Sequence, residues 1–161
     1  TNVNRLLGKK LGVLTLAGDA GKGLLPMALT GWLLTGNDSR QLWILLSGFF
    51  AFLGHLYPVY LRFKGGKGVA TALGVVLYCV PPAVPAALVV FALAVFLTGY
   101  VSVGSLAASA LTPCFVWFLS GSLEKTVLAV CIAFFIWLRH RENIVRLIHH
   151  EEKSWKKAPK E

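Results

Sequence analysis

Charged side chains are scarce in this sequence, and acidic ones are the scarcest. Only 14% of its residues are charged, with 7 Asp and Glu against 16 Lys and Arg, while 56% are hydrophobic. A soluble domain usually carries about 25% charged residues. The apolar residues also lie in long runs, and the mean hydropathy is +0.67. The composition therefore argues against an ordinary soluble domain and indicates that lipid surrounds the chain.

The sequence also lacks the features of a nucleic-acid or metal protein. Its net charge is +9, but the basic residues cluster at the ends of apolar runs and form no separate basic face. The three cysteines, Cys79, Cys114 and Cys131, lie inside apolar runs without metal or redox spacing, which is typical of small buried side chains. We expect no nucleic acid, no metal and no cofactor.

Apolar stretches cover residues 11–35, 42–61, 69–97, 101–119 and 123–138. The third would reach about 43 Å as one helix, longer than a hydrocarbon core of about 30 Å. Pro81 and Pro82 predict a break, because proline lacks a donor and restricts the residue before it. We therefore predict an all-α polytopic membrane bundle of six transmembrane helices, with a half-helix at 69–80 and the next helix at 83–98.

Positive charge falls on one side of this topology. Of the 16 Lys and Arg, thirteen lie on the side that holds the N-terminal segment, the 62–68 segment, the 98–102 turn and the C-terminal tail. The opposite turns, 36–41, 81–85 and 120–125, carry only Arg40 and Lys125, and Lys22 lies within a span. The positive-inside rule makes the first side cytoplasmic. We expect one membrane domain over 1–147 and a polar tail over 148–161, disordered or lying on the anionic lipid surface.

The strongest motif is Lys64-Gly65-Gly66-Lys67-Gly68, directly before the half-helix. Glycines let backbone amides approach a ligand, and a helix N-terminus favours an anion. Lys67 adds a full positive charge. The segment is not a P-loop, because Gly68 stands where that motif needs Ser or Thr. We interpret it as an anion site; the alternative is a flexible loop that carries positive-inside charge.

A second motif, Arg139-His140-Arg141-Glu142-Asn143, ends the last span. His140 and Asn143 are three residues apart and share a helix face, which Arg146 extends. The alternative is interfacial anchoring by snorkelling arginines, which suits Arg139 and Arg141.

Other polar residues are open to a structural interpretation. Asp19 and Lys22 are spaced to form an ion pair within the first span, and we favour a structural pair. His55 could be a base or a buried histidine that is hydrogen-bonded to a carbonyl, and we favour the structural interpretation. Ser102 and Ser105 could bind substrate hydroxyls or cap the next helix.

The cytoplasmic side lacks a protein base of a known acyltransferase kind. No Ser-His-Asp set can be assembled there, and no HxxxxD pair exists, since Val145 stands five residues after His140 and Tyr60 five after His55. The side offers cations, amides, a histidine, an asparagine and hydroxyls, which suit phosphate and polyol binding. A transporter or channel for a phosphorylated solute is the alternative, because broken helices and intramembrane charges occur in transporters.

These segments resemble the PlsY family of bacterial membrane glycerol-3-phosphate acyltransferases. The resemblance covers nearly the whole chain and rests on residues 64–71, 54–58, 140–143 and 19–23. The family has seven membrane helices and three cytoplasmic motifs. Thr1-Asn2 and Arg5 resemble the end of its first motif, so we interpret the chain as lacking the first helix and most of that motif. Activity is accordingly expected of the parent protein.

The resemblance implies acyl transfer from a fatty acyl phosphate to the 1-hydroxyl of glycerol 3-phosphate, giving lysophosphatidic acid and phosphate. The donor's own phosphate would take the proton; the alternative makes His140 a general base. It also implies a monomer in the bacterial inner membrane, with the active site and the C-terminus cytoplasmic. The implied catalytic and binding residues are Lys67, His140 and Asn143, with phosphate bound by Arg5, Lys67 and the amides of Gly65 and Gly66, and hydroxyls contacted by Ser105 or, with less support, Ser102.

Overall fold

A computed structural model describes residues 8–155 of the chain, and all regular structure in that range is helical. The all-α prediction is therefore confirmed for the described part. The elements are α2 (Lys9–Leu33), α3 (Arg40–Leu56), the 3-10 turn η1 (Val59–Leu61), α4 (Val69–Cys79), α5 (Ala83–Thr98), α6 (Val101–Ser120), α7 (Leu123–Arg139) and α8 (Arg141–Ile148).

The double proline breaks the third apolar stretch, as the sequence predicts. Helix α4 has 11 residues and ends at Cys79, and α5 begins at Ala83 with Pro82 as its N-cap residue. One further break was not predicted. The last span ends at Arg139, and after His140 the chain continues as the short helix α8. His140 therefore lies at a helix junction, where its side chain can face the helices on either side.

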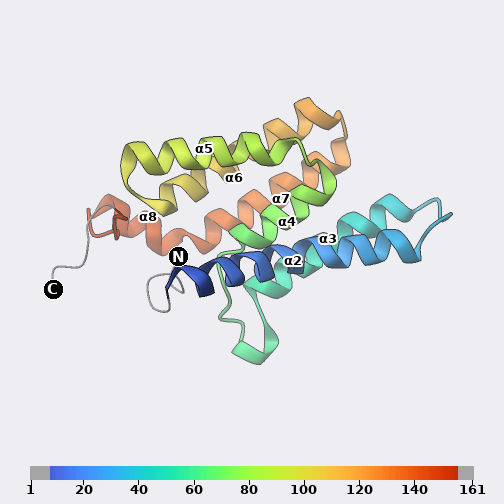
Figure 1. Ribbon diagram of the computed structural model, residues 1–161, viewed down its shortest axis with the longest axis horizontal. Helices are drawn as coiled ribbons and strands as arrows, with labels where there is room; N and C mark the ends of the chain where they lie inside the picture. The colour runs from blue at the N-terminus through green and yellow to red at the C-terminus, as the bar shows by residue number, and fades with distance from the viewer. Residues whose placement is uncertain (1–7, 156–161) are drawn as a thin grey trace.

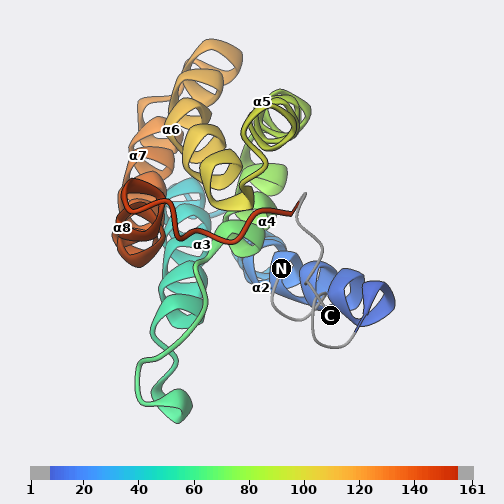
Figure 2. The same ribbon diagram turned by 90° about the vertical axis from the view of Figure 1, so that its left-hand side faces the viewer.

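The helices pack in two groups on either side of α4 (Figure 1). Helix α2 packs against α3 and α4, while α6 packs against α5 and α7. The chain around η1 projects from the bundle, as the turned view shows (Figure 2). Helices α2 and α4 cross in backbone contact: a Cβ on Gly74 would overlap the Ala20 carbonyl, and one on Gly23 would overlap the Thr71 carbonyl. Such small residues are typical of close helix crossings in membranes.

Large apolar side chains cover the outside of the bundle. Trp32 is 73% exposed, Phe96 68% and Phe118 83%. A surface of this kind would aggregate in water but suits lipid. Two segments are long and apolar enough to cross a membrane, Arg40–Leu61 and Val101–Ser120, and α4 and α5 are shorter apolar helices. The count of six spans remains a prediction.

The connections gather at two opposite ends of the bundle, in the grouping that the charge pattern predicts. At one end the Gln41 side chain donates to Glu124 at 2.8 Å, and the Lys125 ammonium donates to the Cys79 carbonyl at 3.1 Å. These bonds join the three turns that are poor in positive charge. At the other end lie the glycine loop (residues 64–68), the α5–α6 turn, the α7–α8 junction and the start of the tail.

The tail is ordered further than expected. The Trp155 amide donates to the Gly99 carbonyl at 2.9 Å, and the Trp155 indole donates to the Val95 carbonyl at 3.3 Å. The Ser154 hydroxyl also donates to Gly99, at 3.1 Å. The alternative of a disordered tail is therefore wrong as far as Trp155, because polar groups of this stretch bind the backbone carbonyls of Val95 and Gly99 at the end of α5.

Candidate functional site

The glycine loop lies directly on the end of α3. The Gly65 amide donates to the Leu56 carbonyl at 3.2 Å, and the Gly66 amide donates to the His55 carbonyl at 3.3 Å. A Cβ on Gly65 would overlap the His55 carbonyl, and one on Gly66 would overlap the His55 ring. Both amides thus donate to α3 in this structure, and their binding of phosphate stays a prediction. The glycines are needed for close approach.

Gly68 begins α4 with φ at 80°, in the left-handed region that glycine favours. A Cβ there would overlap the Phe52 ring. The turn leaves the first amides of α4 without partners inside the helix, as at any helix start. These amides and Lys67 are therefore the groups of the loop that could bind an anion, as the sequence predicts.

The Lys67 side chain is exposed and stands among charges from the α7–α8 end. Partial burial of its ammonium lowers its pKa, and the positive charges of Arg146 and Arg139 lower it further, against the opposing effect of Glu152. A cation that is crowded by other cations gains from a bound anion, because the anion offsets their repulsion. This electrostatic setting suits a phosphate ligand.

Arg139 attaches the glycine loop to the end of α7. Its Nη2 donates to the Gly65 carbonyl at 2.7 Å and its Nε donates to the Gly66 carbonyl at 3.2 Å. Its guanidinium carbon lies 5.5 Å from the centre of the Tyr57 ring. The interpretation of Arg139 as an interfacial anchor is therefore wrong: the side chain turns inward and binds protein.

His140 is buried at the helix junction, with 2% of its surface exposed. Its Nδ1 lies 2.7 Å from the Ile136 carbonyl, so Nδ1 carries the proton and donates, because a carbonyl can only accept. Burial lowers the pKa of the imidazole, the bond to Ile136 raises it, and the charge of Lys67 lowers it again. The net shift favours the neutral ring, whose Nε2 can accept a proton or a hydrogen bond.

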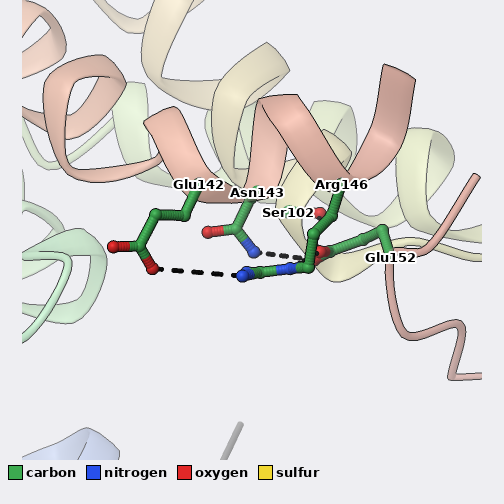
Figure 3. A network of polar contacts seen from close by, with 5 residues as sticks. All are labelled: Ser102, Glu142, Asn143, Arg146 and Glu152. Atoms are coloured by element: carbon green, nitrogen blue, oxygen red, sulfur yellow. Dashed lines mark hydrogen bonds and ion pairs between the residues drawn. The ribbon is translucent and has the colours of Figure 1, made fainter. Parts of the chain in front are cut away.

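Glu152 of the tail organises the other polar groups of this end (Figure 3). Its Oε1 accepts from the Asn143 amide at 2.7 Å and from the Ser102 hydroxyl at 2.9 Å. Its Oε2 accepts from Arg146 Nε at 2.8 Å, and Arg146 also faces Glu142 at 3.9 Å. The network joins α6, α8 and the tail. Sequence reasoning missed Glu152, since it lies beyond the end of α8 and no periodic spacing connects it to Asn143.

Asn143 presents a free acceptor inside this network. The residue is 4% exposed, and its Oδ1 is buried without a hydrogen-bond partner among the described residues. The orientation of the amide follows from Glu152, because a carboxylate requires the nitrogen as donor. A buried polar atom without a partner is uncommon and calls for an explanation, and a ligand hydroxyl would supply one.

Asp19, Lys22 and His55 form a separate cluster beside the loop. Asp19 accepts from Lys22 at 2.8 Å, which bears out their predicted pairing, and His55 Nδ1 lies 3.6 Å from the same oxygen. A cavity of about 350 Å³ opens beside Lys22, His55 and Gly66. The cluster lies on the α2–α3 side of the loop, whereas Lys67 feels the charges of the α7–α8 side.

A match to a family model distinguishes between the two kinds of protein that the sequence left open, an acyltransferase and a transporter. The model described as "Glycerol-3-phosphate acyltransferase" covers residues 1–150. The chain belongs to this acyltransferase family. A transporter is accordingly not favoured.

Relatives within the acyltransferase family extend along nearly the whole chain. A glycerol-3-phosphate acyltransferase of Desulfotalea psychrophila is 54% identical over 157 residues, which covers 98% of this chain and 80% of the relative. One of Syntrophotalea carbinolica is 47% identical over 156 residues, covering 97% of this chain and 78% of the relative. Both relatives thus match almost the whole of the present chain.

Two solved structures of the family member PlsY, an integral membrane glycerol 3-phosphate acyltransferase, share the fold. The lysophosphatidic acid form matches with a TM-score of 0.86 and 36% identity, over 95% of this chain and 76% of that one. The glycerol 3-phosphate form gives the same score and identity over 96% and 76%. With its lipid-type surface, the present chain is likewise a membrane protein.

The structure brings some of the predicted acyltransferase residues together and leaves others apart. Asn143 and Ser102 meet at Glu152, and Lys67 lies close enough to His140 for its charge to lower the pKa of the imidazole. Ser105 is buried, but its hydroxyl donates to the Val101 carbonyl at 3.0 Å, so Ser102 is the serine in the network. Arg5 lies outside the described residues.

Proposed function

We propose that this protein transfers a fatty acyl group from an acyl phosphate to the 1-hydroxyl of glycerol 3-phosphate. The products are lysophosphatidic acid and inorganic phosphate. The family membership supports the reaction class, and the two PlsY structures are described as glycerol 3-phosphate and lysophosphatidic acid forms. The acyl-phosphate donor follows from the family resemblance of the motifs.

One observation carries this proposal: Lys67 and the Asn143–Ser102 network lie at the same end of the bundle, beside the neutral His140. Lys67 binds phosphate, with Arg5 as its partner in the proposed site. The unpaired Oδ1 of Asn143 accepts a hydrogen bond from a glycerol hydroxyl. His140 Nε2 is the second acceptor. Gly65 and Gly66 contribute by shaping the loop.

The hydroxyls of the α5–α6 end complete the proposed pocket for the polyol. Ser102 reaches the same Glu152 oxygen as Asn143, so its own oxygen lies near the free acceptor and can accept from a glycerol hydroxyl. Ser105 remains a proposed contact, through its oxygen. Both serines are buried, which would exclude bulk water from the reacting hydroxyl.

The chemical step needs charge stabilisation more than it needs a protein base. The 1-hydroxyl oxygen attacks the acyl carbon, the bond from that carbon to the phosphate oxygen breaks, and the proton passes to the departing phosphate. Glu152 is unsuited as the base, because its two oxygens already accept from Ser102, Asn143 and Arg146. Lys67 and Arg5 would stabilise the negative charge that develops on the phosphate.

We further propose a monomeric, multi-pass protein of the bacterial inner membrane with six spans in this chain. The membrane domain covers 1–147 and the tail 148–161. The gathering of the charge-poor turns at one end, and of the glycine loop, α8 and the tail at the other, supports this topology. The positive-inside rule then makes the site and the C-terminus cytoplasmic.

Lys67→Ala tests the proposal. Since Lys67 contributes both to phosphate binding and to stabilising the developing charge, its loss should lower lysophosphatidic acid synthesis by roughly 10²–10³-fold. The measurement is conversion of labelled glycerol 3-phosphate by purified protein supplied with acyl phosphate. Lys10→Ala, which removes an exposed lysine from the start of α2, is the matched control and should leave turnover within about twofold. If Lys67→Ala inserts normally and keeps most of its turnover, the assignment of Lys67 is wrong.

A further inference from the structure

The glycine loop is attached to the rest of the protein on two sides. Towards α3, the amides of Gly65 and Gly66 donate to the carbonyls of Leu56 and His55. Towards α7, the carbonyls of the same two glycines accept from Arg139. Among the described residues, the two side-chain hydrogen bonds that join the loop to α7 both come from Arg139. The Arg139 side chain therefore fixes the position of the glycine loop relative to the α7–α8 junction.

The chain positions of the contacting residues give this attachment a functional consequence. Lys67 directly follows Gly66, whose carbonyl Arg139 holds, and His140 directly follows Arg139. Each of the two proposed ligand groups is therefore one residue from the same pair of hydrogen bonds. We infer that Arg139 is a positioning residue, which holds Lys67 at the distance from His140 that substrate binding requires. This inference rests on the proposed function of Lys67 as a phosphate ligand.

Arginine is suited to this task in a way that lysine is not. Two successive carbonyls require two donors in a fixed fork, which the planar guanidinium supplies and a single ammonium does not. The Tyr57 ring at 5.5 Å adds a cation–π contact that keeps the side chain turned inward. The charge of Arg139 also contributes to the lowered pKa of Lys67. A lysine at position 139 would keep the positive charge but could not reproduce both hydrogen bonds to the Gly65 and Gly66 carbonyls.

A double-mutant cycle separates positioning from a general structural role. The affinity for glycerol 3-phosphate is measured by calorimetry on the purified full protein, with Arg139→Gln, Lys67→Ala and the double variant. If Arg139 acts through Lys67, Arg139→Gln should weaken binding roughly 10-fold when Lys67 is present and less than about 2-fold when it is absent. Arg62→Gln removes an exposed arginine just before the loop and should leave the affinity unchanged.

Arg139→Lys serves as the second variant, because it keeps the charge over Tyr57 and is the less disruptive change. It should still weaken glycerol 3-phosphate binding several-fold. The inference is overturned if Arg139→Lys binds as the wild type does, or if the Arg139→Gln effect has the same size in both Lys67 backgrounds. Product formation by the wild type is assayed alongside. If the wild type makes lysophosphatidic acid but the Arg139→Gln effect does not depend on Lys67, the inference alone is refuted. If the wild type makes no lysophosphatidic acid, the proposed function is refuted.

Discussion

At the residue scale, Glu152 controls the environment of the polar groups at the site. Burial raises the pKa of its carboxyl, but the hydrogen bonds from Arg146, Asn143 and Ser102 lower it more, so the pKa lies below its usual value. The ionised carboxylate therefore holds the tail on α6 and α8, and it also fixes the orientation of the Asn143 amide. Because the folded-state pKa is lowered, this contribution is full above the ordinary glutamate pKa and disappears as the pH falls through the folded-state value.

Glu152→Gln should loosen the tail, since an amide offers one acceptor oxygen where the carboxylate offers two. The measurement is the hydrogen-exchange protection of the Trp155 amide, which donates to Gly99 in the folded tail. We expect that protection to fall in the variant at neutral pH. In the wild type it should fall only when the pH drops below the ordinary glutamate range of about 4.3.

Glu151→Gln is the matched control for the tail, because Glu151 is the exposed neighbour of Glu152. Trp155 protection in this variant should equal that of the wild type. Equal protection in all three proteins at neutral pH would show that Glu152 does not hold the tail.

At the element scale, the close crossing of α2 and α4 fixes the helix that carries the glycine loop. Gly23 and Gly74 let the two backbones touch, and α4 carries the glycine loop at its N-terminus. The half-helix was predictable from the sequence, because Pro81 and Pro82 cannot continue a helix and lie within the apolar stretch 69–97. The sequence did not predict that the glycines serve packing, since a glycine read alone can equally provide flexibility, a left-handed turn or close approach.

Gly74→Ala should destabilise the protein by about 1–3 kcal/mol, because its Cβ would overlap the Ala20 backbone, which cannot move aside as a side chain can. Gly18→Ala is the matched control: it lies in the middle of α2, and within residues 8–155 no atom from outside its own stretch of helix comes within 4 Å of the added carbon. That change should be neutral or stabilise by up to about 1 kcal/mol. Thermal unfolding in detergent measures both. Equal unfolding temperatures for the two variants would contradict the close crossing.

At the scale of the whole molecule, charge and hydropathy were sufficient to predict the arrangement of the connections. Long apolar runs fix where helices lie, and the distribution of Lys and Arg fixes which connections share a side. Side-chain contacts across the chain were beyond that reasoning. The pairing of Arg139 with Gly65 and Gly66 spans more than 70 positions, and the return of Glu152 to Ser102 spans 50, so neither leaves a local periodic signal.

The family match supplies the reaction class. Lys67, His140 and Asn143, the proposed site residues, lie together at one end of the bundle. The same end is the one that the positive-inside rule predicts to be cytoplasmic. We therefore expect glycerol 3-phosphate to enter from this face and to be converted there, and we expect the product to stay in the lipid.

Conversion in sealed proteoliposomes tests that claim most directly. Acyl phosphate is included in the lipid and labelled glycerol 3-phosphate is added outside vesicles that hold the protein with its glycine loop facing outward. We expect labelled lysophosphatidic acid in the membrane, one phosphate released for each molecule formed, and no unchanged label in the lumen. Accumulation of intact glycerol 3-phosphate inside the vesicles, without labelled lipid, would contradict it.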